Sequence, residues 1–333
     1  MRAVVISEFG GPEKLVIQER PRPVPSSGEV LIEVKAFGVN RAETYMRRGL
    51  WAEAAPVSGI ECVGAVAEDP DGMLAPGSTV AAVMGGLGRT RDGSYAEYVA
   101  APASNVISLE TSLDWAELAA IPESYATAWS ALNGNLSLES EHTLLVRGAT
   151  SALGQAAVNV AADLGATVIA TTRSSDRVDL LRLLGAAEVL LDEGELAPAI
   201  RADRPDGVDR VLDLVGNSVL RDSLQAVRAD GRVCQAGFLG GLAAVEGFNP
   251  IVDLPTGVQL SFFGSFMLGT PEFPVASIPL NELVAKAEQG AYSAKPARVF
   301  EFDEVADAHR LMEANTAVGK LVVVTSSEIT DHR

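Results

Sequence analysis

The sequence predicts an α/β protein made of a doubly wound parallel sheet and a second, mostly β domain. Short apolar strands that end at glycine or proline fill roughly the first third of the chain, and an alternation of strands and helices follows. The tail returns to mixed elements and ends in the apolar run 320–324. With 333 residues and 47% hydrophobic composition, the chain exceeds what one core accommodates. We therefore assign residues 1–121 and 272–333 to the mostly β domain and residues 122–271 to the parallel sheet.

The mostly β domain is predicted from short runs of small and β-branched residues. Residues 30–34, 63–67 and 79–83 form such runs, and turn residues separate them. The tail strand at 320–324 is expected to rejoin this domain.

The region after about residue 141 alternates strands and helices. Strands are predicted at 143–146, 167–172, 188–191, 208–214, 231–236 and 259–266. Residues 155–164 place alanine, valine and leucine on one helical face, and Gly165 is the expected helix stop. Ser175 is the expected cap of the next helix and Gly185 its end. Because this alternation packs helices on both faces of a sheet, the strands are expected to run parallel.

The charge balance limits the choice of partner. The chain has 26 lysine and arginine residues against 44 aspartate and glutamate residues, a net charge of -18. Such a surface repels phosphate backbones and anionic lipid, so neither nucleic acid nor a membrane is expected as a partner. Glu8 and Glu13 interrupt the stretch where a signal peptide would be apolar, and no uncharged run approaches the roughly 18 residues of a membrane span. We therefore expect a cytoplasmic protein. Cys62 and Cys234 are expected to be small buried residues rather than a disulfide framework.

The motif with the clearest chemistry lies between the first strand and the first helix of the alternating region. It reads Gly148-Ala149-Thr150-Ser151-Ala152-Leu153-Gly154, a dinucleotide-binding turn in which Ser151 replaces the middle glycine. Main-chain N–H groups and the helix dipole at such a turn attract a diphosphate. The alternative is a turn that serves the fold alone. The residues expected to hold the diphosphate are Gly148, Ala149, Ser151, Ala152, Leu153 and Gly154.

The end of the second strand predicts which nicotinamide cofactor is bound. A carboxylate is usual there when the ribose 2′-hydroxyl is recognised. This chain has Thr172 at that position, followed by Arg173, Ser174 and, further on, Arg177. A guanidinium matches a phosphate, so these four residues predict NADP(H) rather than NAD. The alternative is solvated arginine at the start of a helix.

Further motifs follow one another along almost the whole chain. They are Gly38-Val39-Asn40 with Glu43-Thr44-Tyr45 and Arg48-Gly49, the spaced set Pro56, Gly59, Glu61, Gly64 and Val66, then Gly93–Tyr98, Thr127-Ala128-Trp129, Asp213–Gly216 and Gly319-Lys320. In this order the chain resembles the zinc-free quinone oxidoreductase (zeta-crystallin-like) branch of the medium-chain dehydrogenase/reductase superfamily. The resemblance implies a Rossmann-type domain, a GroES-like substrate domain and a homodimer.

The resemblance also implies a site without a metal. Zinc-dependent relatives place a cysteine near the position of Asn40 and a histidine beside that of Glu61. Here no cysteine lies near Asn40, and Ile60 precedes Glu61. Zinc needs about three nitrogen or sulfur ligands even at an open catalytic site. Isolated surface or capping side chains are expected instead for the histidines, which are His142, His309 and His332.

The resemblance places Asn40, Tyr45 and Thr127 near the nicotinamide and the acceptor. Asn40 and Tyr45 are candidate catalytic residues because both carry hydrogen-bond donors for a developing oxyanion. Asn40 and Thr127 are also candidate cofactor ligands. Packing alone is the alternative role of Tyr45, and Glu61 is interpreted as structural. Ligands of parallel sheets lie beyond the carboxyl ends of the strands, which adds the cofactor candidates Val215, Gly216, Gly237 and Phe238.

Together these features predict a zinc-independent, NADPH-dependent reductase that transfers hydride to a quinone or another electron-poor acceptor conjugated to a carbonyl. The acceptor is expected to be a small apolar molecule. One alternative is reduction of the double bond of enones or enoyl thioesters, although thioester-reducing relatives have a catalytic tyrosine where this chain has Trp51. A second alternative is a structural or regulatory protein that binds NADPH without turnover. The apolar run 258–266 lies at the predicted sheet edge, where a second copy would pair.

Overall fold

The computed structural model describes residues 1–325, and the chain divides into two compact units. Unit 1 comprises residues 1–123 together with the segment from residue 266 onward, and unit 2 comprises residues 124–265. The sequence placed the domain limits after residues 121 and 271 and assigned substrate binding to one domain and dinucleotide binding to the other. This assignment stays a prediction.

Unit 2 contains a six-stranded sheet in which every neighbouring pair is parallel. The strand order is β10-β9-β8-β11-β12-β13. The strands are β8 (Thr143–Arg147), β9 (Thr167–Thr172), β10 (Glu188–Leu191), β11 (Val208–Asp213), β12 (Val227–Gln235) and β13 (Gln259–Phe262). Numbered along the sheet this is the 3-2-1-4-5-6 order of a doubly wound dinucleotide-binding fold. The predicted fold class is therefore confirmed for this unit.

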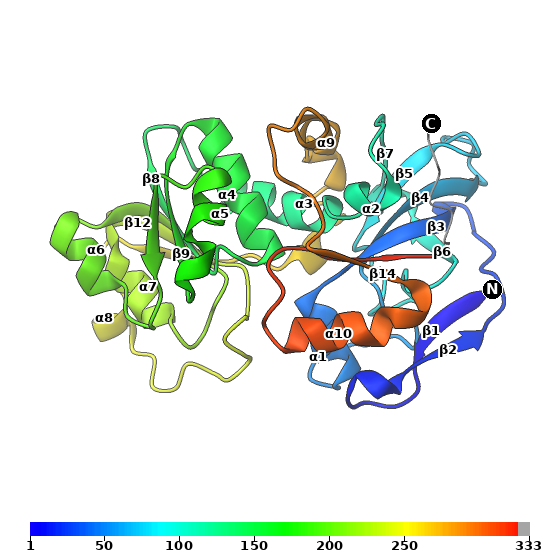
Figure 1. Ribbon diagram of the computed structural model, residues 1–333, viewed down its shortest axis with the longest axis horizontal. Helices are drawn as coiled ribbons and strands as arrows, with labels where there is room; N and C mark the ends of the chain where they lie inside the picture. Colours follow the sequence, from blue (N-terminus) through cyan, green and yellow to red (C-terminus); the bar gives the residue numbers. More distant parts are fainter. Residues whose placement is uncertain (326–333) are drawn as a thin grey trace. The chain divides into compact units, whose positions relative to one another are not determined.

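Helices cover both faces of this sheet, as Figure 1 shows. One face carries α4 (Ala152–Leu164) and α5 (Val178–Leu183), and the other carries α6 (Ala197–Asp203) and α7 (Leu220–Ala226). The unit also contains most of α3 (Pro122–Ser130) and the short α8 (Pro250–Asp253). Helix α4 ends at Gly165, whose φ of 94° lies in the left-handed region that glycine adopts without strain, as the sequence predicted.

Several local predictions in unit 2 are wrong. Strand β12 begins at Val227 rather than at the predicted residue 231. Ser175 does not cap α5, because it is the first residue of the 3-10 helix Ser175–Arg177 that precedes α5. The turn before this 3-10 helix is closed by the Thr172 hydroxyl, which accepts from the Ser174 N–H. The sixth strand ends at residue 262 rather than 266. Its partner β12 ends at Gln235, whose carbonyl accepts one last bond from Phe263 N–H, so the ladder has no further partner.

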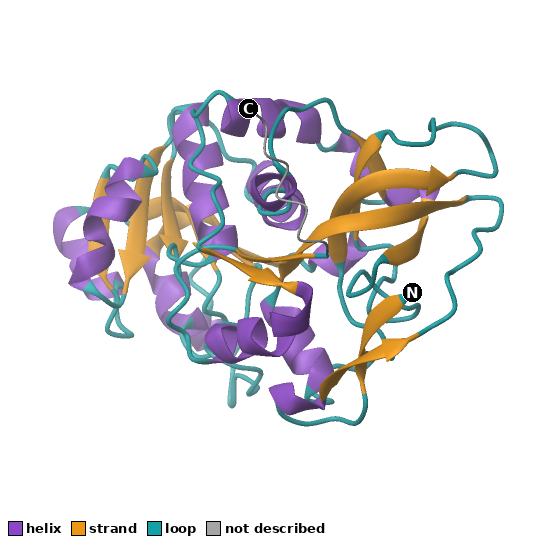
Figure 2. Ribbon diagram, turned by 45° about the vertical axis from the view of Figure 1, so that its right-hand side comes forward, coloured by secondary structure: helices purple, strands orange, loops and turns teal. Residues whose placement is uncertain are grey.

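Unit 1 is built mainly of strands joined by loops, drawn orange and teal in Figure 2. Its main sheet has the order β14-β15-β3-β4-β5-β7, with β6 also paired to β3, and β1 and β2 form a separate pair. The strands are β1 (Arg2–Ile6), β2 (Leu15–Glu19), β3 (Glu29–Val39), β4 (Glu61–Glu68), β5 (Thr79–Val83), β6 (Tyr98–Pro102), β7 (Val106–Ser108), β14 (Arg298–Glu301) and β15 (Leu321–Val324). Strand β15 pairs antiparallel with β3, so the tail joins the sheet begun by the first part of the chain.

Unit 1 also contains the helices α1 (Arg41–Arg47), α2 (Trp115–Leu118), α9 (Leu280–Glu288) and α10 (Val305–Glu313). Helix α2 contacts β3, β4 and β15, and α10 contacts β14 and β15. The core between them is apolar and includes the stacked rings of Phe37 and Tyr95, whose centroids are 4.5 Å apart. Cys62 in this unit and Cys234 in unit 2 are both buried and free, as predicted.

A chain of buried polar side chains crosses the core of unit 1 between α1 and α10. His309 is fully buried, so the prediction that it lies at the surface or caps a helix is wrong. Arg47 can only donate, so its contact to Nδ1 (3.2 Å) makes Nδ1 an acceptor and leaves Nε2–H to donate to Tyr95 Oη (3.0 Å). Tyr95 in turn donates to Glu43 (2.7 Å). The chain therefore holds only while the imidazole is neutral.

The other two histidines differ from His309. His142 is also buried rather than at the surface, and its Nδ1 accepts from the Glu139 N–H at 3.0 Å. His332 lies outside the residues that the structure describes.

Burial, together with the nearby Arg47 charge, lowers the pKa of His309 from 6.5 to about 3. Unfolding lets this ring bind a proton between these two values, so its contribution to stability falls as the pH falls through that window. Burial also raises the pKa of Glu43 to about 7. The contribution of Glu43 to stability therefore falls as the pH rises from 4.5 to about 7, opposite to that of His309.

His309→Gln should therefore change the slope of stability against pH. Glutamine can still donate to Tyr95 but does not titrate. Between about pH 4 and about pH 6, the wild type minus variant difference in unfolding free energy should rise by about 1.4 kcal/mol per pH unit. Urea unfolding at a series of pH values measures it, and a difference that does not vary with pH would contradict the assignment.

Candidate functional site

The predicted dinucleotide turn lies between β8 and α4 and is closed by its own polar groups. Gly148 has a φ of 84°, and its carbonyl oxygen accepts from the N–H (3.2 Å) and the hydroxyl (2.9 Å) of Ser151. Ser151 is the N-cap of α4, and its hydroxyl oxygen accepts from the Gly154 N–H at 3.1 Å. The serine that replaces the middle glycine of the motif therefore holds the turn and starts the helix, which begins at Ala152 instead of the predicted residue 155.

The first turn of α4 lies directly against the main chain of this turn. A Cβ on Gly154 would lie 2.5 Å from Gly148 O and 2.6 Å from Ala149 Cα, so only glycine fits. The N–H groups of Ala152 and Leu153, at the first two positions of the helix, have no acceptor within the helix. Small side chains and outward N–H groups at a helix N-terminus fit a diphosphate.

The loops that follow β11 and β12 lie beside this turn. A Cβ on Gly148 would be 3.0 Å from a Leu239 methyl group and 3.6 Å from one of Val215. Gly216, with a φ of 88°, approaches Gly237, because a Cβ there would lie 2.5 Å from the Gly237 carbonyl oxygen. The structure thus brings the predicted residues of both loops to the carboxyl end of the sheet.

The Asp213 carboxylate, at the end of β11, fixes the first of these loops. One carboxylate oxygen accepts from the N–H groups of Val215 (2.9 Å) and Gly216 (2.8 Å). The other accepts from the Ser223 hydroxyl at 2.7 Å. In the second loop, Phe238 packs its ring against Phe262, with centroids 5.9 Å apart.

Two arginines, Arg173 and Arg177, follow the end of β9, and the exposed Asp176 lies between them in the sequence. Thr172 and Ser174 form the turn described above, and Arg173 is exposed. Within residues 1–325, no hydrogen bond or ion pair is found for the side chain of Arg173 or Arg177. Their guanidinium groups therefore remain available to an external anion such as a phosphate.

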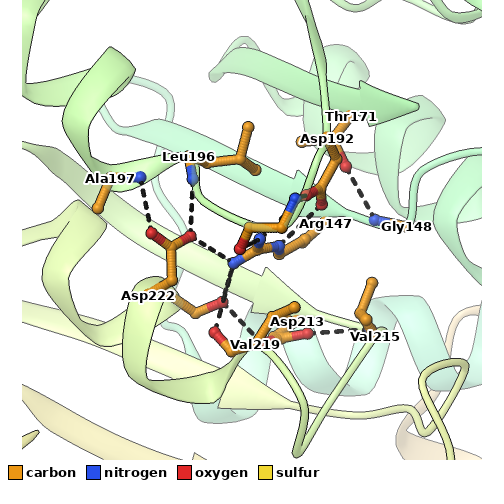
Figure 3. A network of polar contacts seen from close by, with 12 residues as sticks. Arg147, Gly148, Thr171, Asp192, Leu196, Ala197, Asp213, Val215, Val219 and Asp222 are labelled. Atoms are coloured by element: carbon orange, nitrogen blue, oxygen red, sulfur yellow. Dashed lines mark hydrogen bonds and ion pairs between the residues drawn. The ribbon is translucent and has the colours of Figure 1, made fainter. Parts of the chain in front are cut away.

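Sequence reasoning missed a buried arginine directly before the turn (Figure 3). Arg147 ends β8, and its side chain is fully buried. It donates to both carboxylate oxygens of Asp192 (2.8 and 3.0 Å) and to Asp222 (2.7 Å), and it also reaches the carbonyl of Gly194 (2.8 Å). An arginine inside an otherwise apolar central strand was the available signal, because such a charge needs buried partners.

Arg147 links segments that are far apart in the sequence. Asp192 follows β10, and Asp222 lies in the first turn of α7, where it also accepts from the N–H groups of Leu196 and Ala197. Burial alone would lower the pKa of Arg147, but the charges and hydrogen bonds of its aspartate partners outweigh it and raise the pKa. The guanidinium therefore stays charged and ties the end of β8 to the loop after β10 and to the first turn of α7.

Arg147→Met should destabilise unit 2 by about 3–5 kcal/mol, because it leaves two partly buried carboxylates without their cation. Arg182→Met is the matched control, since Arg182 forms an exposed pair with Asp179 that is worth about 0–1 kcal/mol. Hydrogen exchange of the β8 and β11 amides measures the stability of this unit. Equal protection in the two variants would show that the Arg147 network contributes little.

The remaining predicted site residues lie in helices α1 and α3. Tyr45 is 9% exposed within α1, and Asn40 is the partly exposed N-cap of that helix. Thr127 lies in α3 and is buried.

Asn40 belongs to a buried charge cluster of unit 1 that sequence reasoning also missed. Its amide nitrogen donates to Glu61 Oε1 (3.0 Å), and its amide oxygen accepts from Lys320 Nζ (2.6 Å). Lys320 Nζ lies 2.5 Å from Glu61 Oε1 and 3.7 Å from Glu123 Oε2. The lysine comes from the tail and the glutamates from β4 and the start of α3, so nothing in the local sequence shows that they meet.

Comparison with known proteins identifies the family. The zinc-binding dehydrogenase family model matches residues 152–281, and that of the alcohol dehydrogenase GroES-like domain matches residues 26–111. The quinone oxidoreductase of Mus musculus is 31% identical over 260 residues, which cover 72% of this chain and 74% of that protein. The chain belongs to the quinone oxidoreductase branch of the medium-chain dehydrogenase/reductase superfamily.

Solved structures agree with this assignment. The structure of a mycobacterial protein complexed with NADPH is 26% identical, with a TM-score of 0.86, and the match covers 98% of this chain and 100% of that one. An NAD-dependent alcohol dehydrogenase is 28% identical with a TM-score of 0.83 and the same coverage. The predicted family and the Rossmann-type plus GroES-like fold class are thus confirmed, and the chain is an oxidoreductase of this superfamily.

The family model carries zinc in its name, but the residues present here do not fit that metal. Lys320 places an ammonium 2.5 Å from Glu61, where it would repel a dication. Asn40 and Ile60 offer neither a thiolate nor an imidazole. Across residues 1–325, no group of three or more histidine, cysteine, aspartate or glutamate residues could hold a metal ion. The same part of the chain contains no helix that is both long and apolar enough to span a bilayer.

Proposed function

We propose that this oxidoreductase is a zinc-independent reductase that uses NADPH to reduce a quinone or another electron-poor acceptor conjugated to a carbonyl. The observation that carries the proposal is the strand–turn–helix at Gly148–Gly154, together with the two arginines after β9 whose charge has no partner within residues 1–325. The family, with quinone oxidoreductases as curated relatives, supports the reaction class.

The chain's own groups account for recognition of the coenzyme. The N–H groups at the start of α4 hold the diphosphate, and the glycines of the two neighbouring loops allow close approach of its remainder. Arg173 and Arg177, with Ser174, hold the ribose 2′-phosphate. Asp192, whose N–H donates to the Thr172 carbonyl at the end of β9 (2.8 Å), is paired with Arg147 and therefore does not repel that phosphate. When bound, the reduced nicotinamide supplies the hydride.

Arg173→Ala should weaken NADPH binding about 10- to 100-fold and leave NADH binding unchanged. The loss corresponds to about 1.5–3 kcal/mol for a charge-assisted hydrogen bond. Titration calorimetry with both coenzymes measures the two dissociation constants. Arg182→Ala, on the neighbouring α5, is the matched control. Equal weakening of NADPH and NADH by Arg173→Ala would defeat the NADP(H) assignment.

Asn40 and Tyr45 are the proposed donors for the negative charge that develops on the acceptor after hydride transfer. A phenol can donate a hydrogen bond or a proton, and a carboxamide can donate a hydrogen bond. A donor aimed at a developing oxyanion stabilises it strongly in a site that excludes water. Thr127 is proposed as a further cofactor contact. The alternative role of Tyr45 is to line the site by packing alone, without donating a hydrogen bond.

Steady-state oxidation of NADPH with a panel of quinones and enones tests the reaction. Turnover with quinones supports the proposal, whereas turnover with enones alone favours the alternative of a double-bond reductase. Coenzyme binding without turnover on either panel favours a protein that binds NADPH for a structural or regulatory purpose. Trp51 stands where thioester-reducing relatives have a tyrosine, so enoyl thioesters are the least favoured acceptors.

Tyr45→Phe separates the two roles of that residue. If the phenol donates to the transition state, kcat should fall about 100-fold or more while the NADPH dissociation constant stays the same. If the ring only packs, kcat should remain at the wild-type value, because phenylalanine keeps the ring.

A homodimer through β13 is proposed as the assembly. This strand is the edge of the unit 2 sheet, and Leu260 (38%) and Phe262 (51%) are exposed on it. Pairing of two such edges across a two-fold axis would satisfy the unpaired main-chain groups. As expected from the sequence, we propose that the protein acts in the cytoplasm on a small apolar acceptor. Neither nucleic acid nor a membrane is a proposed partner.

Phe262→Asp should shift the protein from dimer to monomer in sedimentation velocity, because the charge would be buried between the two edges. Val24→Asp, at an exposed apolar position of unit 1 (85% against 51% for Phe262), should leave the dimer intact. A monomeric wild type would rule out this assembly.

A further inference from the structure

The ammonium of Lys320 is the buried cation of the charge cluster that includes Asn40. Its side chain is 3% exposed, and Glu61 and Glu123 are buried beside it. Burial alone would lower the pKa of Lys320, but the charges of Glu61 and Glu123 outweigh it and raise the pKa. The ammonium is therefore charged at neutral pH, and Asn40, which is partly exposed, is the member of the cluster that reaches the surface of unit 1.

This arrangement fixes the orientation of the Asn40 carboxamide. An ammonium has donors only, so the atom of Asn40 that lies 2.6 Å from Lys320 Nζ must be the amide oxygen. The amide nitrogen then faces Glu61 Oε1 at 3.0 Å and uses one hydrogen there. Its contact to the Gly38 carbonyl is long, at 3.5 Å, and leaves the second hydrogen weakly held.

The backbone around Asn40 is held as firmly as its side chain. Glu43 accepts from the Asn40 N–H at 2.6 Å, and this carboxylate is buried. Gly38, two residues earlier, leaves space for the cluster, because a methyl group there would overlap the side chains of Lys320 and Glu61. The carboxamide is thus anchored at both ends, and to donate to an acceptor it has only the long contact to the Gly38 carbonyl to give up.

We infer that Lys320 is a positioning residue for the proposed reaction, which acts by holding Asn40 with its oxygen toward the ammonium and an amide N–H toward the acceptor. The inference rests on the proposed function. The ammonium also draws electron density from the amide oxygen, which makes the amide N–H a stronger donor. Without Lys320, the carboxamide is free to turn and present its oxygen to an oxyanion, which would oppose the reaction.

A double-mutant cycle separates this role from a purely structural one. Asn40→Ala should lower kcat with a quinone about 100-fold, the usual loss for one oxyanion donor, and Lys320→Met should lower it about 10- to 100-fold. In the Asn40→Ala background, Lys320→Met should have no further effect on kcat. A lysine that only neutralises Glu61 and Glu123 would lower kcat by the same factor in both backgrounds, and that result would overturn the inference.

Two controls keep the result interpretable. Lys295→Met removes an exposed lysine of unit 1 and should leave kcat unchanged. If Lys320→Met alone does not fold, Glu61→Gln combined with Lys320→Met removes both charges of the closest pair and leaves no unpaired carboxylate at Glu61. Wild-type kcat in that double variant would also overturn the inference.

A measurement without turnover distinguishes failure of the inference from failure of the proposed function. In protein labelled with 15N-asparagine, the side-chain amide signal that Asn40→Asp removes is the Asn40 signal. In Lys320→Met this signal should move and its protons should exchange faster, whereas Lys295→Met should leave it in place. An unmoved signal would overturn the inference even if the enzyme reduces quinones. A moved signal in a protein that calorimetry shows not to bind NADPH would uphold the orientation of Asn40 and reject the proposed function.

Discussion

The close contact between the turn after β8 and the first turn of α4 is the constraint on which the carboxyl end of the unit 2 sheet, the proposed coenzyme site, depends. Gly148 and Gly154 approach so closely that a single methyl group on Gly154 would collide with the main chain of the turn. Ser151 holds this contact from within, because its hydroxyl bonds to both glycines. The helix therefore starts at the strand end with its first N–H groups pointing outward, and the loops after β11 and β12 pack beside it. Once this contact is fixed, little freedom remains in where a diphosphate can lie.

Buried charge is used in a similar way in both units. Arg147 in unit 2 and Lys320 in unit 1 each sit among carboxylates, and in each case the cation holds a neighbouring group in one orientation. In unit 2 the consequence is electrostatic. Asp192 and Asp222 belong to an acidic chain of net charge -18, yet Arg147 neutralises them where the proposed 2′-phosphate site begins. An anion can therefore be attracted locally by a protein that repels anions overall, because short-range pairs outweigh the distant surface charge under physiological screening.

Features set by local chemistry were predictable from the sequence, and those set by distant contacts were not. The bounds of β9 and the helix stop at Gly165 depend on neighbouring residues, so periodicity and glycine placement revealed them. His309 looked like an isolated polar residue because its partners, Arg47 and Tyr95, lie more than two hundred positions earlier. Lys320 was assigned to a strand by its apolar neighbours, and only the pairing of β15 with β3 brings it to Asn40. Spacing along a chain carries no information about which distant residues meet, and for that reason the buried partners of His309 and Asn40 were not predicted.

The pairing of β15 with β3 also affects the order in which the chain can fold. All of unit 2 is synthesised between the two strands, so its parallel sheet has its full sequence while the sheet of unit 1 still lacks β14 and β15. Until the tail emerges from the ribosome, residues 36–39 of β3 lack the strand partners that β15 supplies, and Glu61 lacks the Lys320 cation. Lys320, the cation that holds Asn40 in one orientation, is therefore added to the sheet of unit 1 only after all of unit 2 has been synthesised.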